Sequence, residues 1–271
     1  MKKLFKKIVT LTALGTLAFS LTACSTANTS NTTTTSTIDK EEWIIGLDDT
    51  FAPLGFRDQN GELTGYDIDL AKAMGEKLGK KLTLQPIDWS MKEAELNSGN
   101  IDLIWNGYTI TDERKEKVDF TTPYLDNKQI IVVLADSSIQ SKADLAGKSV
   151  GAQSESSAVT AMEKESDLYA SFKDGKAVTF EDNNQALMDL DSKRIDAVVA
   201  DEVVVRYYIT LKGDNKYRIL DEDFGAEEYG VGIRKGDTKT VEAFNKAYEE
   251  LKADGTIAEI STKWFGSDVA K

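Results

Sequence analysis

The residue types of a carboxylate-binding site occur together in Asn106–Arg114, directly after an apolar run that predicts a buried strand. Within this segment Gly107 exposes its backbone and Thr109 offers a hydroxyl group. Arg114 adds a planar guanidinium that can bind a carboxylate through two hydrogen bonds. The same segment also fits a helix start, because Thr111 can cap the helix and the acids after it favour the first turn. Both interpretations remain open.

A second set of polar residues lies where strands in the later half of the chain are predicted to end. Gln153, Ser156 and Ser157 lie at a strand-to-helix junction, where backbone N–H groups can hold an anion. Asp201 follows the apolar run Ile195–Ala200 and can accept hydrogen bonds from an ammonium group. Like the two serines, it can instead cap the next helix. A carboxylate site and an ammonium site at equivalent strand ends are what a zwitterion requires.

Two aromatic residues, Phe51 and Trp89, can stack on a ligand or belong to the hydrophobic core. The sequence contains no histidine and one cysteine, Cys24. Serine–histidine–aspartate catalysis, cysteine–histidine catalysis and histidine metal ligation are therefore excluded, and we expect no metal and no other cofactor. An enzyme would have to use carboxylates, lysine or tyrosine.

The elements that would position these residues alternate between strand and helix from about residue 41. Strands are predicted at 43–47, 82–87, 101–105, 129–134, 149–152, 178–180, 195–200 and 229–233, and helices at 66–78, 91–97, 158–165, 183–190, 203–211, 241–251 and 257–264. Two similar α/β units with parallel sheets follow from this order. Ligands of such sheets lie outside the carboxyl ends of the strands, so the crevice between the units is the expected site.

The first 23 residues have the pattern of a secretory signal peptide. Four lysines precede the uncharged apolar stretch Ile8–Leu21, which is shorter than the roughly 20 residues of a spanning helix. Leu21–Cys24 resembles the lipobox of bacterial lipoproteins, in which the cysteine is lipidated and becomes the new N-terminus. An ordinary signal peptide with an incidental cysteine, or an uncleaved anchor, is the alternative. Residues 24–40 are mostly Ser, Thr and Asn after Cys24 and predict a flexible linker that spans on the order of 20 Å.

The charge of the chain argues against two classes of partner. The net charge is −13, and loss of the four signal lysines changes it to −17. Acidic and basic residues are interspersed along the chain. We therefore expect no nucleic acid partner and no electrostatic attraction to anionic lipid, and the charge itself is explained by solubility.

Motifs along the whole body resemble the polar amino-acid-binding proteins of ABC importers, the group that contains histidine-, glutamine- and arginine-binding receptors. The matching segments are Asp48–Leu54, Gly65–Ala71, Thr109–Arg114, Val118–Tyr124, Arg194–Ala197 with Asp201, Asp254–Thr256 and Lys263–Gly266. The resemblance implies a two-lobed periplasmic-binding-protein-like fold of type II, in which each lobe has a central, mainly parallel sheet flanked by helices. It also implies two hinge crossings, near 127–129 and 229–230. Lobe 1 would comprise 41–128 with 231–271, and lobe 2 would comprise 129–230.

The family pattern implies roles for the residues that end the strands. Arg114 would bind the α-carboxylate of the ligand together with Thr109 and the backbone near Ser157. Asp201 and the carbonyl of Gly107 would bind the α-ammonium group.

Other positions would surround the side chain of the ligand. Phe51 and Trp89 would enclose it, and Asn106 would lie beside it. Gln153 occupies a position that often contacts the ligand, and Ser156 belongs to the same predicted site.

Two departures from the family pattern bear on the ligand. Where relatives have a Ser-Gly-Thr or Ser-Gly-Ser turn, this chain has Ser154-Glu155-Ser156. Glycine permits positive φ, so Glu155 either accepts another backbone conformation or places a carboxylate near the pocket. Residues 88–96 with 105–108 resemble a Gram-positive subgroup that includes arginine- and cystine-type receptors. Asp48 and Glu155 are candidates for side-chain specificity. The extra acids near the pocket, Glu93 and Glu155, favour a cationic, arginine-like ligand or cystine unless both face water. Glutamine or another polar amino acid is the alternative.

The resemblance implies a monomeric receptor, lipid-anchored through Cys24 at the outer face of the cytoplasmic membrane of a Gram-positive cell. Its partners would be an amino acid, an ABC permease and an ATPase. Two other functions fit the same fold. One is an enzyme that resembles cyclohexadienyl dehydratases, for which Glu155 is the candidate acid. The other is a sensory or adhesive lipoprotein without a role in transport.

Overall fold

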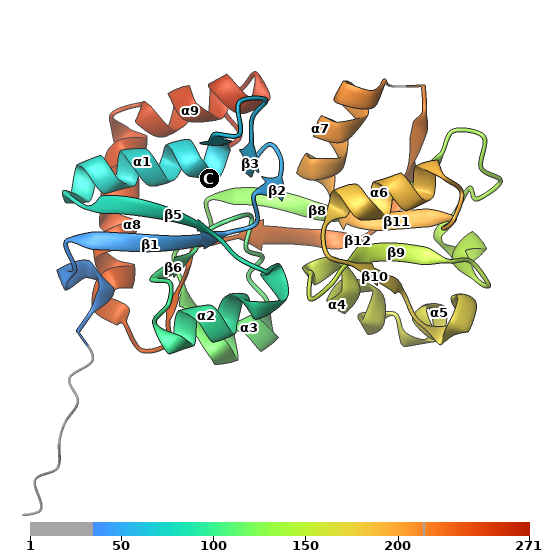
Figure 1. Cartoon of the computed structure of the whole chain (residues 1–271), viewed down its shortest axis with the longest axis horizontal. Coiled ribbons are helices and arrows are strands. Elements are labelled where there is room, and N and C mark those ends of the chain that lie inside the picture. The colour runs from blue at the N-terminus through green and yellow to red at the C-terminus, as the bar shows by residue number, and fades with distance from the viewer. Residues whose placement is uncertain (1–34, 214) are drawn as a thin grey trace, which may run out of the picture. The chain divides into compact units, whose positions relative to one another are not determined.

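The computed structural model of the protein describes residues 35–213 and 215–271, which form two lobes of sheet and helix (Figure 1). The predicted signal peptide, the lipidation site at Cys24 and most of the linker lie outside the described residues and stay predictions. Among the helices that are described, none is long and apolar enough to cross a membrane.

The first lobe is built on a five-stranded sheet in the order β5–β1–β6–β13–β7. The strands are β1 (Glu42–Leu47), β5 (Lys81–Pro86), β6 (Leu103–Ile104), β7 (Val118–Phe120) and β13 (Gly232–Arg234). The helices are α1 (Tyr66–Leu78), α2 (Lys92–Ser98), α3 (Asp112–Lys117), α8 (Thr238–Ala253) and α9 (Thr256–Phe265). α1 and α9 lie on the opposite side of the sheet from α2 and α3 (Figure 1). β1 is apolar along most of its length because both faces of the sheet are covered.

The second lobe contains a five-stranded sheet in the order β10–β9–β11–β8–β12. The strands are β8 (Leu125–Leu134), β9 (Val150–Gln153), β10 (Val178–Phe180), β11 (Ala197–Asp201) and β12 (Tyr217–Tyr229). The helices are α4 (Ser157–Lys164), α5 (Ser166–Ser171), α6 (Asn183–Asp191) and α7 (Glu202–Lys212). In Figure 1, α6 and α7 lie above the sheet and α4 and α5 below it.

Several short elements complete the described chain. A small antiparallel sheet of β2 (Thr50–Phe51), β3 (Gly55–Arg57) and β4 (Leu63–Thr64) precedes α1. The 3-10 helices are η1 (Thr37–Asp39), η2 (Trp89–Met91), η3 (Lys142–Leu145) and η4 (Lys173–Gly175). None of these short strands or 3-10 helices follows from hydrophobic periodicity, because each is too short to show a repeat.

Both large sheets are mixed but mainly parallel, because four of the five strands in each sheet run in one direction; the expected fold class is confirmed. β1 is parallel to β5 and β6, and β9 is parallel to β10 and β11, as strand–helix–strand units require. β13 is antiparallel to β6 and β7, and β8 is antiparallel to β11 and β12. The antiparallel strands belong to the segments that lead from one sheet to the other and are not preceded by a helical crossover within their own sheet.

The chain passes between the sheets twice, through strands that pair with each other. β7 leads through residues 121–124 into β8, and β12 leads through residues 230–231 into β13. β8 and β12 pair from Leu125 with Tyr229 to Leu134 with Tyr217. The sequence predicted β12 only at its last residue. Its register shifts twice, at Ile219/Asp223 and at Asp223/Ala226, and such irregularities remove the two-residue alternation by which a strand is recognised.

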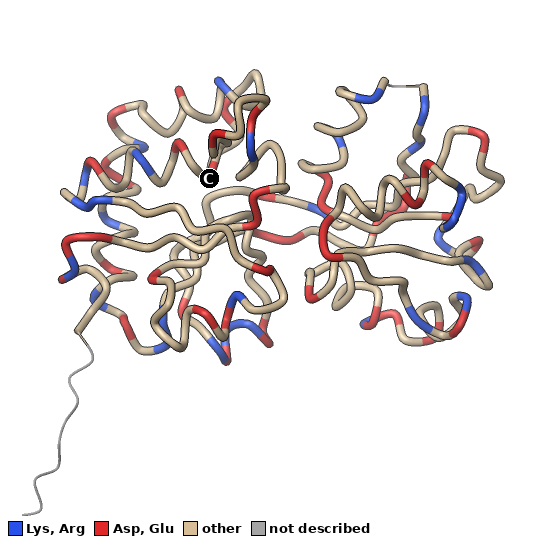
Figure 2. The backbone as a smooth tube through the Cα atoms, in the orientation of Figure 1, with Lys and Arg blue, Asp and Glu red and all other residues tan. Residues whose placement is uncertain are grey.

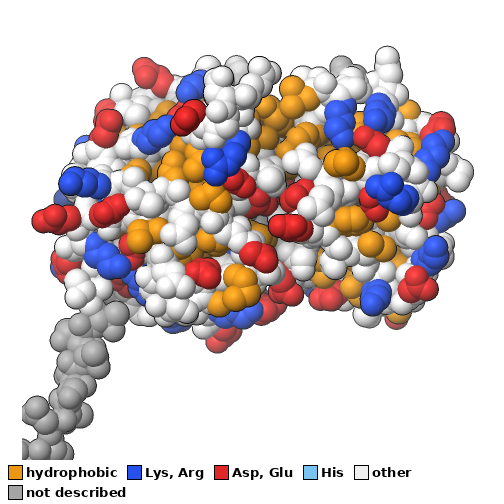
Figure 3. All heavy atoms as spheres, viewed as in Figure 1, with side chains coloured by type: hydrophobic (Ala, Val, Ile, Leu, Met, Phe, Trp, Pro, Cys, Tyr) orange, Lys and Arg blue, Asp and Glu red, His pale blue; other side chains and the backbone are white. Residues whose placement is uncertain are grey.

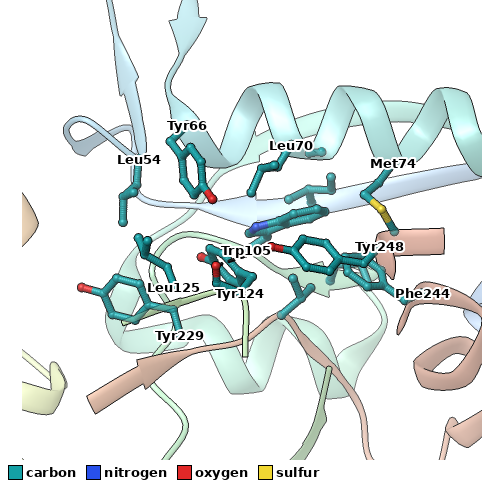
Figure 4. Close-up of a cluster of buried hydrophobic side chains, with 14 of the residues drawn as sticks. Leu54, Tyr66, Leu70, Met74, Trp105, Tyr124, Leu125, Tyr229, Phe244 and Tyr248 are labelled. Atoms are coloured by element: carbon teal, nitrogen blue, oxygen red, sulfur yellow. Dashed lines mark hydrogen bonds between the residues drawn. The ribbon is translucent and has the colours of Figure 1, made fainter. Parts of the chain in front are cut away.

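An aromatic-rich cluster forms the core of the first lobe (Figure 4). Trp105 packs edge-on against Phe244 at 5.1 Å between ring centroids, and Tyr124 lies between Trp105 and Tyr229. The hydroxyl of Tyr229 points away from the other labelled side chains (Figure 4). The ring of Tyr229 therefore packs in the core, and its hydroxyl points out of the cluster.

Acidic and basic residues are spread along the backbone of both lobes (Figure 2).

Candidate functional site

Arg114 lies in α3 and is buried, with its guanidinium held by backbone carbonyls of both lobes. Nη1 donates to the Thr109 carbonyl at 3.0 Å, and Nη2 donates to the Glu155 carbonyl at 3.2 Å. The group lies 4.6 Å from the centroid of the Tyr108 ring. The Thr111 hydroxyl accepts from the Arg114 backbone N–H at 3.1 Å, so the N-cap interpretation of this segment is confirmed. Within residues 35–213 and 215–271, Arg114 forms no ion pair with a carboxylate.

Asp201 ends β11 and is buried at the start of α7, where its side chain makes no capping hydrogen bond. Its Oδ1 instead accepts from Asn127 Nδ2 at 2.7 Å, Gln129 Nε2 at 2.9 Å and the Tyr229 hydroxyl at 2.6 Å. Burial, and next the carboxylate of Glu227, raise the pKa of Asp201. The capping alternative for this residue is therefore wrong, and the side chain faces the two strands that join the lobes.

Hydroxyl groups from both lobes connect the arginine to the aspartate. The Thr109 and Ser157 hydroxyls lie 3.0 Å apart, and Gln129 Nε2 donates to Ser157 Oγ at 3.1 Å. The Thr109 hydroxyl also donates to Glu227 Oε1 at 3.0 Å. The hydroxyl of Ser156, at the N-cap of α4, is buried and has no hydrogen-bond partner among the described residues. The structure thus brings Thr109, Ser157, Arg114 and Asp201 together.

A second contact between the lobes joins Gln153 to Asp48. Gln153 Nε2 donates to Asp48 Oδ2 at 2.7 Å and to the Glu181 carbonyl at 3.1 Å. Asp48 Oδ1 accepts from the backbone and the hydroxyl of Thr50, at 2.9 and 2.7 Å. Burial raises the pKa of Asp48 despite these hydrogen bonds. Asp48 is therefore a buried acid that lacks a cation among the residues described here.

Glu155 accepts an unusual backbone conformation, which is the first of the two alternatives that the sequence left open. Its φ is 54°, in the left-handed region that favours glycine, and its side chain is exposed. Its carbonyl accepts from Lys92 Nζ at 3.1 Å as well as from Arg114. Burial lowers the pKa of Lys92 to about 8. Glu155 thus contributes its backbone to the contact between the lobes, and the residue lines a surface hollow of about 280 Å³.

Gly107 occupies a position that admits no side chain. Its φ is 59°, and a Cβ there would lie 2.7 Å from Phe51 Cε1 and 2.8 Å from Leu54 Cδ1. Its N–H donates to Asp67 Oδ2 at 2.8 Å. The neighbouring Asn106 is 1% exposed, and neither its amide nitrogen nor its amide oxygen has a partner among the described residues. An amide buried in this way is costly unless a ligand or water supplies its hydrogen bonds.

The two predicted aromatic walls both belong to hydrophobic clusters. Phe51 packs in the aromatic core of the first lobe, and Trp89 packs in a smaller cluster, edge-on to Tyr108 at 5.9 Å between ring centroids. The core interpretation is thus confirmed for both. Their contact with a ligand stays a prediction.

Five further residues belong to this group of contacts and were missed by the sequence predictions: Asp67, Lys92, Asn127, Gln129 and Glu227. Asn127 and Gln129 are two residues apart on β8, so they face the same side of the sheet. Two polar residues at this spacing, followed directly by a wholly apolar run, were the available signal. Glu227 offered none, since β12 was not predicted.

The fold and this constellation define a two-lobed α/β receptor in which a buried guanidinium on α3 and a buried carboxylate at the end of β11 lie beside the contact between the lobes. The chain belongs to the bacterial extracellular solute-binding proteins of family 3, whose sequence model matches residues 43–267. The predicted resemblance to the polar amino-acid-binding proteins of ABC importers is confirmed.

Two curated relatives match most of the chain. It is 34% identical over 230 residues to the L-cystine-binding protein TcyJ of Escherichia coli K12, a match that covers 84% of either chain. It is 31% identical over 264 residues to the arginine-binding extracellular protein ArtP of Bacillus subtilis 168, covering 96% of this chain and 98% of the relative.

Two solved structures extend the comparison. A substrate-binding protein of an ABC uptake transporter from Streptococcus pneumoniae with bound histidine is 43% identical, with a TM-score of 0.83, and the match covers 86% of this chain and 96% of that one. The ancestral amino-acid-binding protein AncCDT-1, described as a precursor of cyclohexadienyl dehydratase, is 35% identical with a TM-score of 0.77, covering 85% and 100%.

Proposed function

We propose that this chain is an extracytoplasmic receptor that binds a polar amino acid between its lobes and delivers it to an ABC importer. The observation that carries the proposal is a pair of buried, opposite charges without ion partners among the described residues. Arg114 and Asp201 are 7% and 4% exposed. An amino acid zwitterion supplies a carboxylate for one and an ammonium group for the other, and both buried charges are then compensated.

The contacts between the lobes support binding by closure. Arg114 and Lys92 of the first lobe donate to the Glu155 carbonyl of the second, and Asp48 accepts from Gln153. Because these bonds join the two lobes, they belong to a closed state. A ligand that contacts both lobes favours that state by its difference in affinity.

We further propose a cationic, arginine-like amino acid or cystine as the ligand, with glutamine or another polar amino acid as the alternative. Asp48 supports a cation, because it is a buried acid whose present partners, Thr50 and Gln153, are neutral. Relatives named for cystine and arginine and a structure with bound histidine agree with this range.

The test is a thermal-shift screen with L-arginine, L-histidine, L-cystine and L-glutamine, followed by titration calorimetry of the amino acid that raises the melting temperature. We expect Arg114→Ala and Asp201→Ala each to weaken binding by roughly 2–5 kcal/mol, as for truncation of one partner of a desolvated charge pair. Arg206→Ala is the matched control, since Arg206 is exposed and pairs with Glu202 on the surface.

Unchanged affinity in both site variants would refute the assignment of the site. A screen without any shift, in protein shown to be folded, would refute the amino-acid function itself.

An enzymatic function has support from one structural relative, AncCDT-1. Such an enzyme needs a protonated acid in the pocket, and the candidate from the sequence, Glu155, has an exposed side chain. We therefore propose a binding protein without enzymatic activity. Incubation of the purified protein with prephenate or arogenate tests this, because release of product would contradict it.

The remaining proposals concern the setting of the receptor. We place it at the outer face of the cytoplasmic membrane, as a monomer anchored through a lipid on Cys24, in a Gram-positive cell. A permease and an ATPase would be its partners. Family membership supports the extracytoplasmic site and the importer.

A further inference from the structure

Two carboxylates, those of Asp201 and Glu227, share one pair of amide donors at the proposed ammonium end of the site. Asn127 Nδ2 lies 2.7 Å from Asp201 Oδ1 and 2.6 Å from Glu227 Oε1. Gln129 Nε2 lies 2.9 and 2.7 Å from the same two oxygens. Because both oxygens contact the same two nitrogens, the carboxylates lie next to each other.

This group has more hydrogen-bond acceptors than donors. Within the described residues neither carboxylate forms an ion pair, and the amide oxygens of Asn127 and Gln129 are buried without a donor. Both amide side chains are at least nine-tenths buried. An ammonium group carries a positive charge and three N–H donors, so it corrects both the charge and the missing donors.

The charges on the surrounding elements do not neutralise the pair. They are Asp126 and Lys128 on β8, Asp223 and Glu228 on β12, Glu202 on α7, Lys164 on α4, and Asp112 and Arg114 on α3; the hydroxyl of Tyr229 on β12 is uncharged and donates to Asp201. Lys128 pairs with Asp223 at 3.6 Å, and Lys271 pairs with Asp126 and Glu228. Lys164 is exposed at the last turn of α4. Within the described part of the chain, Arg114 donates to the Thr109 carbonyl and forms no hydrogen bond with either carboxylate.

Acidic side chains also gather near the middle of the face drawn in Figure 3. Glu227 itself is half-buried and lines two surface hollows, one with Asp126 and Glu202 and the other with Ser157 and Lys164. One side of Glu227 therefore faces the buried site while the other has access to water.

We infer that Glu227 is the second carboxylate of the ammonium site: in the empty protein one proton bridges Glu227 and Asp201, and the ammonium group of the ligand replaces it. This inference rests on the proposed amino-acid function. The proton leaves to water on the exposed side of Glu227. Two carboxylates in contact cannot both ionise without a cation, and the raised pKa of Asp201 agrees with this.

The inference makes binding depend on pH in a stated direction. At pH values below the range in which the empty pair loses its shared proton, each ligand that binds must displace that proton. Above this pH range the proton is already gone, and no displacement is needed. Affinity therefore rises with pH, up to about tenfold per pH unit for one released proton, and then becomes constant. A site whose carboxylates are already ionised near neutral pH in the empty protein would show no such rise.

The experiment is titration calorimetry of the purified full chain with L-arginine, and with L-glutamine as a second ligand, at about pH 7 in phosphate, HEPES and Tris. These buffers differ in their enthalpy of ionisation, so the dependence of the heat on the buffer counts the protons released. The side chains of the two ligands, arginine and glutamine, do not titrate near this pH. We expect the wild type to release a large fraction of one proton per ligand and Glu227→Gln to release less than half of the wild-type amount.

Glu228→Gln is the matched control, because Glu228 is the next residue of β12 and pairs with Lys271 instead. It should release as many protons as the wild type. If the wild type binds with the same heat in all three buffers, the inference is overturned. This result needs no variant, so it holds whether or not the variants fold. Weaker binding in Glu227→Gln with unchanged proton release would also overturn it. If neither amino acid gives a binding heat and none of the four shifts the melting temperature, the proposed function fails instead.

Discussion

Replacing Gly107 by alanine tests whether the segment after β6 is shaped by the packing around the site. Two separate costs follow from the structure. The backbone at Gly107 has φ 59°, and the left-handed conformation costs a residue with a Cβ roughly 1–2 kcal/mol. The new Cβ would also lie 2.7 Å from Phe51 Cε1 and 2.8 Å from Leu54 Cδ1, and such overpacking typically costs about 1–3 kcal/mol. The sum is a loss of roughly 2–5 kcal/mol of unfolding free energy.

Gly79→Ala separates the two costs. Gly79 has φ 65°, close to that of Gly107, but no atom of the described residues would lie within 4 Å of a Cβ there. We therefore expect Gly79→Ala to lose only the conformational part, and the difference between the variants should be about 1–3 kcal/mol.

Urea unfolding followed by tryptophan fluorescence and circular dichroism measures both variants, with the slope of the free energy against urea checked for constancy. Gly107→Ala should also weaken amino-acid binding, because Phe51, which we expect to enclose the ligand, must move. Gly79→Ala should bind as the wild type does. Equal destabilisation in the two variants would refute the reasoning, since the contacts with Phe51 and Leu54 would then have no cost.

Two further predictions concern a strained turn and a buried acid. Glu155→Gly should raise the free energy of unfolding by up to about 1 kcal/mol, because Glu155 has φ 54°, and should leave affinity unchanged, because only its carbonyl joins the contact between the lobes. Lys193→Gly, at φ 56°, is the control for stability, and a loss of affinity specific to Glu155→Gly would show that the carboxylate has a role. Burial raises the pKa of Asp67 to about 7, so this carboxyl keeps its proton in the folded protein over a range where the unfolded chain has lost it. Stability should therefore fall as pH rises from about 4 to 7, by about 1.4 kcal/mol per unit at most from this group, and Asp67→Asn should remove that part of the decline. Urea unfolding at several pH values measures it, and equal pH slopes in wild type and variant would contradict the assignment.

Much of the fold could be predicted from the sequence because it depends on local pattern. α1 occupies residues 66–78 as predicted and ends at Gly79, which has φ 65°. Such helices are recognised by their apolar period and by a glycine that alone takes the left-handed conformation cheaply. The strands β1, β5 and β9 to β11 lie within two residues of their predicted bounds, because short apolar runs are also a local pattern. Arg114 and Asp201 were identified by residue type at strand ends and by family motifs.

What each of these side chains does was decided by tertiary contacts. Asp201 had the sequence of a helix cap, yet its side chain bonds Asn127, Gln129 and Tyr229. Those partners come from β8 and β12, whose pairing joins residues about 100 apart in the chain, Asn127 with Glu227. No local pattern encodes such a pairing, because the energy that selects it comes from burial and hydrogen bonds between distant segments. The sequence by itself determined which charges are present and where the strands that carry them end. Only the tertiary structure set Glu227 beside Asp201, because the irregular strand β12 is held in place by β8.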